Sequence, residues 1–396
     1  TWNNKKLSLA AQYLQFLGTN KMNAEEITKA FYKIACSFNI SAGSEFTTVT
    51  IEGLQENFSP AVKLFEDVLK NCKADDAALQ SLKLRLKKSR TDAKANKGAI
   101  MSGLMNYARF GKVNPFNTTL SNTEIDDISS SELVNTLHGL NSYSHKILYY
   151  GPQPLAQLTT SLKTMHSIPA VFKAAPQKIK FTPTVQNKNQ VLFADYNMVQ
   201  SEIRWIRNSA AYNPALEPVV DVFNNYFGGG MGALVFQTIR ESKALAYSTF
   251  AFFAKPDKKE DPFFTIAYVG CQADNFNESI VAMNELLNNL PDVEENIKYA
   301  KEGIKKDIET ERITQDGIIF NYLAAQQKGL NEDIRKKTYK AVDEIGYKEL
   351  KQFHDEYLAH KAYNYCIVAS EKKLSEDDMK KYGEVKKLSL EEIFGY

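Results

Sequence analysis

The chain has 396 residues, of which 43% are hydrophobic and 11% aromatic, enough for two or three domains with buried cores. Its 49 basic and 47 acidic side chains leave a net charge of +2, too close to neutral to indicate nucleic acid or an anionic membrane as the main partner. The longest strongly apolar run, 246–254, is shorter than the about 18 residues of a spanning helix, and the four cysteines are widely spaced. These features argue against a transmembrane protein, a zinc ribbon and a disulfide framework.

The first half of the chain predicts a helix, two strands and two helices. Apolar and polar side chains alternate between Thr47 and Glu52, as in a strand with one covered face. Leu79, Leu82 and Leu86 lie on one helical face, which favours a helix over a strand in that segment. The expected elements span 24–36, 38–44, 46–53, 57–71 and 75–97.

The second half predicts two strands and a helix, followed by the same order of elements as the first half. These elements are expected at 190–195, 201–207, 214–226, 231–243, 246–254, 262–271, 276–289 and 292–312. Strand pairs followed by helices predict an α+β fold with a mostly antiparallel sheet packed against helices in each half.

An internal repeat sets the domain organisation. The segment after Asn57-Phe58 is similar to the segment after Asn275-Phe276, a shift of 218 positions from Phe58 to Phe276, and Gly111 matches Gly329 at the same shift. A fixed shift over this length predicts two tandem homologous domains.

The predicted boundaries are a first domain over 1–168, an extended linker over 169–184 and a second domain over 185–396. The linker carries Pro169, Pro176 and Pro183. The first copy has no counterpart of the strands at 190–207, so we expect its domain to be truncated at the N-terminus and the polypeptide to continue upstream of Thr1.

Two segments carry a family signature. Gly228 to Gly232, then Ile239-Arg240-Glu241 and Leu245-Ala246-Tyr247, form a Gly-rich turn, a helix with Arg-Glu and a Leu-Ala-Tyr strand start. Phe16-Leu17-Gly18-Thr19 precedes the helix-like segment 23–27. Both segments resemble the insulinase/pitrilysin family of zinc metallopeptidases, which includes the mitochondrial processing peptidases. The resemblance extends over nearly the whole chain and implies a processing-peptidase-like (metallohydrolase) fold.

The resemblance also locates a degenerate zinc motif. The family places H-x-x-E-H on the helix before the Gly-Thr segment, and those positions fall here on Leu9, Gln12 and Tyr13. None can act as zinc ligand or general base in that setting. The family's downstream glutamate ligand is expected near Lys87 to Arg90, where the residues are basic or neutral. The resemblance therefore implies no metal in this chain, with zinc in a missing N-terminal half or a partner.

Arg240 and Tyr247 are the site residues that the resemblance retains. In the family, the matching arginine and tyrosine come from the zinc-free half and reach toward the substrate. A guanidinium and a phenol supply hydrogen-bond donors without competing for a metal. The alternative interpretation is a surface helix residue and a half-buried strand residue.

Three further patterns have a simpler interpretation beside a functional one. The Gly228 to Gly232 turn could cradle a phosphate, but it lacks a P-loop lysine, which favours a turn that lets helix and sheet approach closely. The basic run from Lys83 to Lys97 favours a solvated helix face over a polyanion site. His354 and His360 lie about 120° apart on a helix, which disfavours a shared metal.

These observations predict a non-catalytic C-terminal half, or partner subunit, of a zinc metalloendopeptidase that forms the substrate chamber. This chain alone is predicted to be inactive, with a zinc-bearing half or subunit and a peptide substrate as partners and no nucleic acid or membrane span. The alternative is a structural or assembly pseudo-peptidase scaffold. Both the cytoplasm and the periplasm are compatible with the sequence.

Overall fold

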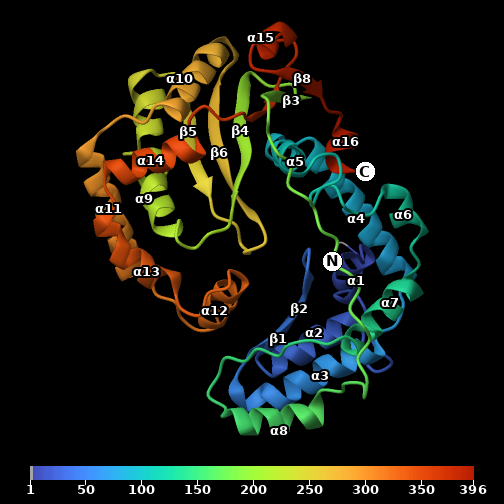
Figure 1. The fold of residues 1–396 in the computed structure, drawn as a ribbon. Coiled ribbons are helices and arrows are strands. Elements are labelled where there is room, and N and C mark those ends of the chain that lie inside the picture. Colours follow the sequence, from blue (N-terminus) through green and yellow to red (C-terminus); the bar gives the residue numbers. More distant parts are fainter. Residues whose placement is uncertain (1–2) are drawn as a thin grey trace. The chain divides into compact units, whose positions relative to one another are not determined.

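The computed structural model describes residues 3–396, which form two compact units (Figure 1). Thr1 and Trp2, the first residues of the predicted first domain, lie outside the described residues. The first unit contains the chain up to residue 95, then 115–181 and 395–396. The second unit contains 96–114 and 182–394.

The first unit is a β-hairpin packed against helices. Its two strands pair antiparallel, beginning with Cys36 opposite Gly53 and ending with Ala42 opposite Thr47. Phe38, Ile40 and Ile51 face a core that includes Phe31 and Phe65. Its elements are α1 (Lys6–Leu14), α2 (Ala24–Lys33), β1 (Cys36–Ala42), β2 (Thr47–Gly53), η1 (Gln55–Asn57), α3 (Phe58–Asn71), α4 (Asp76–Lys94), α6 (Asn122–Asp127), α7 (Ser130–His138), η2 (Leu140–Ser142) and α8 (Leu155–Met165).

Local sequence signals explain where several of these helices begin. Asn23 and Glu26 form a reciprocal capping box at the start of α2, and Asp75 caps α4 by accepting a hydrogen bond from the Ala78 amide. Each cap satisfies amide groups that have no partner within the helix.

The second unit is built on a six-stranded sheet in the order β5-β6-β4-β7-β3-β8. The pairings from β5 to β7 are antiparallel, and those of β3 with β7 and β8 are parallel. The strands are β3 (Gln190–Asp195), β4 (Gln200–Ala211), β5 (Ser248–Ala254), β6 (Pro262–Gln272), β7 (Asn364–Ala369) and β8 (Glu384–Lys387). The other elements are α5 (Lys97–Phe110), α9 (Glu217–Phe227), η3 (Phe236–Ser242), η4 (Ala273–Asn275), α10 (Phe276–Asn288), α11 (Glu294–Thr310), α12 (Gly317–Gln327), α13 (Ile334–Ala341), η5 (Val342–Glu344), α14 (Tyr347–Tyr357), α15 (Glu376–Lys380) and α16 (Leu390–Phe394).

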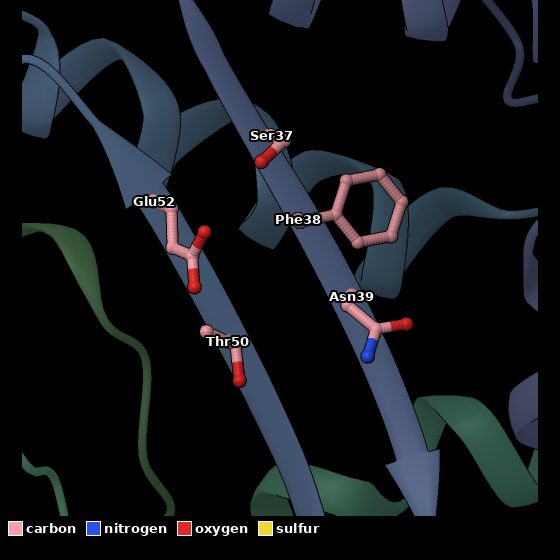
Figure 2. Close-up of a pocket in the computed structure, with 5 residues that line it drawn as sticks. All are labelled: Ser37, Phe38, Asn39, Thr50 and Glu52. Carbon is pink, nitrogen blue, oxygen red and sulfur yellow. The ribbon is translucent and has the colours of Figure 1, made fainter. Parts of the chain in front are cut away.

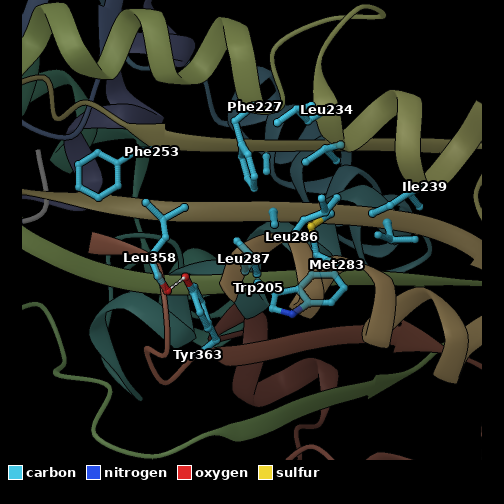
Figure 3. Close-up of a cluster of buried hydrophobic side chains, with 14 of the residues drawn as sticks. Trp205, Phe227, Leu234, Ile239, Phe253, Met283, Leu286, Leu287, Leu358 and Tyr363 are labelled. Carbon is cyan, nitrogen blue, oxygen red and sulfur yellow. Dashed lines mark hydrogen bonds between the residues drawn. The ribbon is translucent and has the colours of Figure 1, made fainter. Parts of the chain in front are cut away.

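Aromatic and aliphatic side chains fill the space between one face of this sheet and its helices (Figure 3). Trp205 is fully buried there, and its Nε1 donates to the Asn284 Oδ1 at 2.8 Å. The Tyr363 hydroxyl donates to the Leu358 carbonyl at 3.1 Å. The polar atoms of these large rings are thus paired, which removes the cost of burying them.

Helix α5 covers the opposite face of the same sheet. All six residues of β7 are buried, as expected for a strand covered on both faces. On the α5 side, the Asn364 Nδ2 donates to the Ala108 carbonyl at 3.0 Å, and Lys97 forms an ion pair with Glu202. A helix that belongs to the first sequence repeat therefore packs on the second sheet.

The α+β prediction, with a mostly antiparallel sheet, is confirmed. The repeat is also visible in the structure, since η1 and α3 recur as η4 and α10, and Gly111 and Gly329 both have positive φ. The helix expected at 231–243 differs, because residues 236–242 have π-helical rather than α-helical geometry. Within residues 3–396, helices with the length and apolar character needed to cross a membrane are not found.

Candidate functional site

Arg240 lies in the π-helical segment η3 of the second unit. In this geometry the Lys243 amide donates to the Thr238 carbonyl, five residues back, at 3.1 Å. The Arg240 guanidinium lies 4.8 Å from the centroid of the Phe236 ring, and its Nε is 3.8 Å from Glu241. Its side chain is 45% exposed, so its remaining donors can reach a ligand.

Tyr247 lies immediately before β5. Its amide donates to the Gly270 carbonyl at 2.9 Å, which fixes the main chain beside β6. Its phenol oxygen accepts a hydrogen bond from the Gln272 Nε2 at 2.5 Å, and the residue is 54% exposed. Since Gln272 occupies an acceptor position of the phenol oxygen, the phenol proton can be donated to a ligand.

Arg240 and Tyr247 sit on one continuous turn of chain but have separate partners. Ala244, between them, has a φ of +51°, a left-handed conformation that reverses the chain from η3 toward β5. Among the described residues, Arg240 contacts Phe236 and Glu241, whereas Tyr247 contacts Gln272 and Gly270. Their side chains are thus two exposed donor groups that are anchored independently.

The Gly-rich turn lies against β5. A Cβ atom on Gly228 would fall 2.3 Å from the Ala251 carbonyl oxygen, so only glycine fits there. Asn224, at the end of α9, also bonds the Phe253 main chain at 2.8 and 3.1 Å. These contacts confirm the interpretation of the Gly cluster as a close-approach turn.

The three degenerate zinc positions lie on α1 and do not form a cluster of polar groups. Leu9 and Tyr13 are buried in the core of the first unit, and Gln12 is exposed. The Tyr13 hydroxyl donates to the Asp75 carbonyl at 2.6 Å and accepts from the Asp75 amide at 2.7 Å, while burial raises the pKa of Tyr13. These residues do not fit a zinc ion. Over residues 3–396 there is no group of three or more His, Cys, Asp or Glu arranged to hold a metal.

The basic run of α4 is partly buried, so its interpretation as a solvated helix face is wrong at two positions. The Lys83 Nζ donates to the carbonyls of Asp126 and Ile128 at 2.8 and 2.7 Å. Arg90 donates to the Leu120 carbonyl at 2.6 Å and is also buried. Both cations therefore bind the loop and helix that follow α5 in sequence.

The sequence interpretation did not identify Gln272 as the partner of Tyr247. The two residues are 25 positions apart, and their contact depends on the β5–β6 register, in which Ser248 pairs with Gly270. Only the predicted strand pair offered a signal. His354, by contrast, is a buried core residue whose Nε2 lies 3.2 Å from the Leu286 carbonyl.

A pocket of about 150 Å³ lies on the hairpin of the first unit (Figure 2). Ser37, Phe38 and Asn39 of β1 line it together with Thr50 and Glu52 of β2. It contains one carboxylate and no predicted site residue, so it does not extend the candidate site.

Several solved structures share this fold. The chain is similar to the peptidase M16 inactive domain from Pseudomonas fluorescens (15% identity, TM-score 0.69, covering 93% of this chain and 90% of that chain). It is also similar to the periplasmic protease PqqL from Escherichia coli (11%, 0.69, covering 93% and 41%). A third similar structure is a mutant of the ferredoxin protease FusC in complex with Arabidopsis ferredoxin (14%, 0.69, covering 92% and 40%). The chain thus spans about two fifths of each of these two proteases.

Two family models match different parts of the sequence. The model described as insulinase (peptidase family M16) matches residues 3–123, and the model described as peptidase M16 inactive domain matches residues 146–303. Together these ranges include more than half of the chain, and the chain belongs to the insulinase (M16) family. These matches support a non-catalytic, peptidase-like protein. A comparison with curated proteins found no match.

Proposed function

We propose that this chain is the zinc-free half, or the zinc-free partner subunit, of a zinc metalloendopeptidase. A second M16 half would carry the zinc and the general base, and this chain would form part of the wall of the peptide chamber. The match to the inactive-domain model supports this proposal, as does the coverage of only about two fifths of PqqL and FusC. We also propose that this chain binds no zinc itself, because Leu9, Gln12 and Tyr13 do not fit the ion.

In this proposal Arg240 and Tyr247 contact the peptide. The observation that carries this step is the hydrogen bond from Gln272 to the Tyr247 phenol oxygen, because it orients an exposed hydroxyl and leaves its proton available. A phenol directed at a peptide carbonyl stabilises the negative charge that develops on that oxygen during hydrolysis. The Arg240 guanidinium has donors for main-chain carbonyls of the same peptide.

The test is the Tyr247→Phe variant in the assembled, zinc-bearing peptidase. We expect kcat to fall at least about 10-fold with a smaller change in KM, because the lost donor acts mainly on the transition state. Tyr299→Phe is the matched control, since Tyr299 is 58% exposed and its hydroxyl donates to Glu295. Unchanged kcat in Tyr247→Phe would remove Tyr247 from the site.

A structural or assembly role without catalysis is the second candidate. The packing of the Arg240 guanidinium on Phe236 favours it, because that contact gives Arg240 a role in the fold. This candidate predicts that Arg240→Ala and Tyr247→Ala lower stability but leave peptide binding unchanged. Binding of a labelled peptide to the wild-type chain and both variants separates the two proposals.

A further inference from the structure

Two histidines of the first unit meet end to end. His145 lies in the extended segment after η2, and His166 directly follows α8. Their Nε2 atoms are 2.7 Å apart and their ring centroids 4.9 Å apart. The centroid distance exceeds the Nε2 distance by about two imidazole ring radii. Both nitrogens therefore lie between the two rings and point at each other.

The other ring nitrogen of each histidine also has a partner. The His145 Nδ1 lies 2.7 Å from the Tyr143 carbonyl oxygen, which can only accept a hydrogen bond. The His166 Nδ1 lies 2.6 Å from the Glu66 Oε1, and the Asn141 Nδ2 donates to the Glu66 Oε2 at 3.2 Å. The His166 and Glu66 side chains are only 16% and 17% exposed.

A proton count follows when all three contacts are hydrogen bonds. Three hydrogen bonds connect the group: one between Tyr143 and His145, one between the two histidines, and one between His166 and Glu66. Each of them needs one proton. Two neutral imidazoles and a carboxylate hold two protons, so the closed arrangement contains one additional proton and has a net charge of zero. This count is the same whether the proton between His166 and Glu66 lies on the nitrogen or on the oxygen.

A metal ion does not fit between the two rings in this arrangement. Metal–imidazole bonds of about 2.0–2.1 Å would hold two nitrogens that face each other roughly 4 Å apart. The observed separation of 2.7 Å is that of a hydrogen bond.

We propose that Glu66, His166 and His145 form a pH-dependent latch, closed by a single shared proton, that holds the end of α8 and the segment around His145 against α3. Removing the proton places two nitrogen lone pairs face to face. Adding a further proton places two N–H groups face to face. The latch therefore opens on either side of the pH range in which one proton is shared.

Glu66 is the acidic group in contact with the pair. Phe172 packs edge-on against His145 with ring centroids 5.9 Å apart, and His145 itself is exposed. Asp67 is bound by Lys21 and by Asn71. Other charged or titratable groups on the surrounding elements include Lys63 and Lys70 of α3, Lys163 of α8, Glu132 and His138 of α7, and Lys146 and Lys173 in the flanking segments.

The first test is hydrogen exchange of the full chain, followed in peptides from 143–173 between about pH 5 and about pH 9. After correction for intrinsic exchange, we expect protection to be highest at an intermediate pH. It should fall on both sides by up to about tenfold per pH unit, the limit for one linked proton. Protection that is independent of pH in these peptides would overturn the proposal.

Two variants provide matched comparisons. His145→Gln keeps an amide that can donate to the His166 Nε2 but does not titrate, so we expect it to lose the decrease at alkaline pH. His360→Asn removes an exposed histidine of the second unit and should behave like the wild type in these peptides. A His145→Gln profile identical to that of the wild type would contradict the latch.

Nitrogen NMR of the histidine rings tests the proton count in the unmodified chain. At the pH of greatest protection, the His145 Nδ1 should be protonated, and the two Nε2 atoms should share one proton. Titration with Zn²⁺ or Ni²⁺ is the competing measurement. Stoichiometric binding that is lost when either histidine is replaced would assign the pair to a metal and overturn the shared proton.

Discussion

Gly228 shows how one residue fixes the position of the candidate site. Its main chain lies against Ala251 of β5, the strand that directly follows Tyr247. A side chain at this position would push the turn away from the strand, and the start of β5 would shift with it.

We therefore expect Gly228→Ala to lower the free energy of unfolding by about 1–3 kcal/mol, the range for an overpacked site. Urea denaturation measures this difference. Gly230→Ala is the control, because a Cβ atom there meets nothing within 4 Å. An equal loss in both variants would show that glycine flexibility, and not the contact with Ala251, sets the effect.

His354 gives a pH dependence with a defined sign. Burial lowers the pKa of His354 below its ordinary value of 6.5. Between the lowered value and 6.5 the unfolded chain binds a proton that the folded chain does not, so stability falls as the pH decreases through this range. We expect His354→Gln to reduce this acid-dependent loss, measured as the free energy of unfolding at several pH values.

The family resemblance identified Arg240 and Tyr247 as candidates but not their partners. The contact of Gln272 with Tyr247 depends on strand register and joins residues 25 positions apart. The contact of His145 with His166 depends on helix packing and joins residues 21 positions apart. Local periodicity carries no information about such contacts. Side-chain partners across elements were therefore beyond the sequence interpretation.

Helix α4 carries a buried cation that stabilises a neighbouring loop. The Lys83 Nζ binds the carbonyls of Asp126 and Ile128, and the residue is 4% exposed. We expect Lys83→Met to cost about 2–4 kcal/mol, because two buried carbonyls lose their donor. Thermal and urea unfolding measure this loss.

Lys88→Met on the same helix is the matched control. Its side chain is 81% exposed and lies 4.0 Å from Asp92, so we expect a change within about 0.5 kcal/mol. A loss at Lys88 as large as that at Lys83 would show that the charge of the helix, and not the buried contact, determines stability.

Most elements were predictable because their apolar spacing agrees with their final environment. The strand expected at 190–195 is observed as Gln190–Asp195, and the helix expected at 57–71 as Phe58–Asn71. The π-helical geometry of η3 was not predictable, because apolar spacing alone does not distinguish it from an α-helix. The interpretation of the basic run in α4 as a solvated face was wrong at Lys83 and Arg90. Lysine and arginine are usually exposed, and nothing in the sequence indicated the partners that allow these two to be buried.

At the scale of the whole molecule, a substitution in α5 tests how the chain is divided into its two units. Leu104 of α5 is fully buried, and this helix packs on β3, β4 and β7. We expect Leu104→Ala to cost about 2–5 kcal/mol and to increase hydrogen exchange in these strands but not in the β1–β2 hairpin. Leu84→Ala, at a position that is 69% exposed, is the control. Increased exchange confined to the hairpin would contradict the assignment of α5 to the second unit.

The repeat was readable from the sequence, whereas the placement of α5 was not. The shift that relates Gly111 to Gly329 predicts two copies of one fold, and both glycines have positive φ. Which sheet a helix covers depends on long-range packing, and Ile100, Met101 and Leu104 would suit either sheet by pattern alone.

The chain passes from one unit to the other after residues 95, 114, 181 and 394. A single cut in the exposed segment near 181 would leave one fragment with α5 from the second unit and another with Tyr396, whose ring packs on Arg90 of the first. Each fragment would keep part of both units. Proteolytic nicking would thus yield a non-covalent complementation pair rather than two free domains, and cleavage seen on a denaturing gel would coexist with an intact particle.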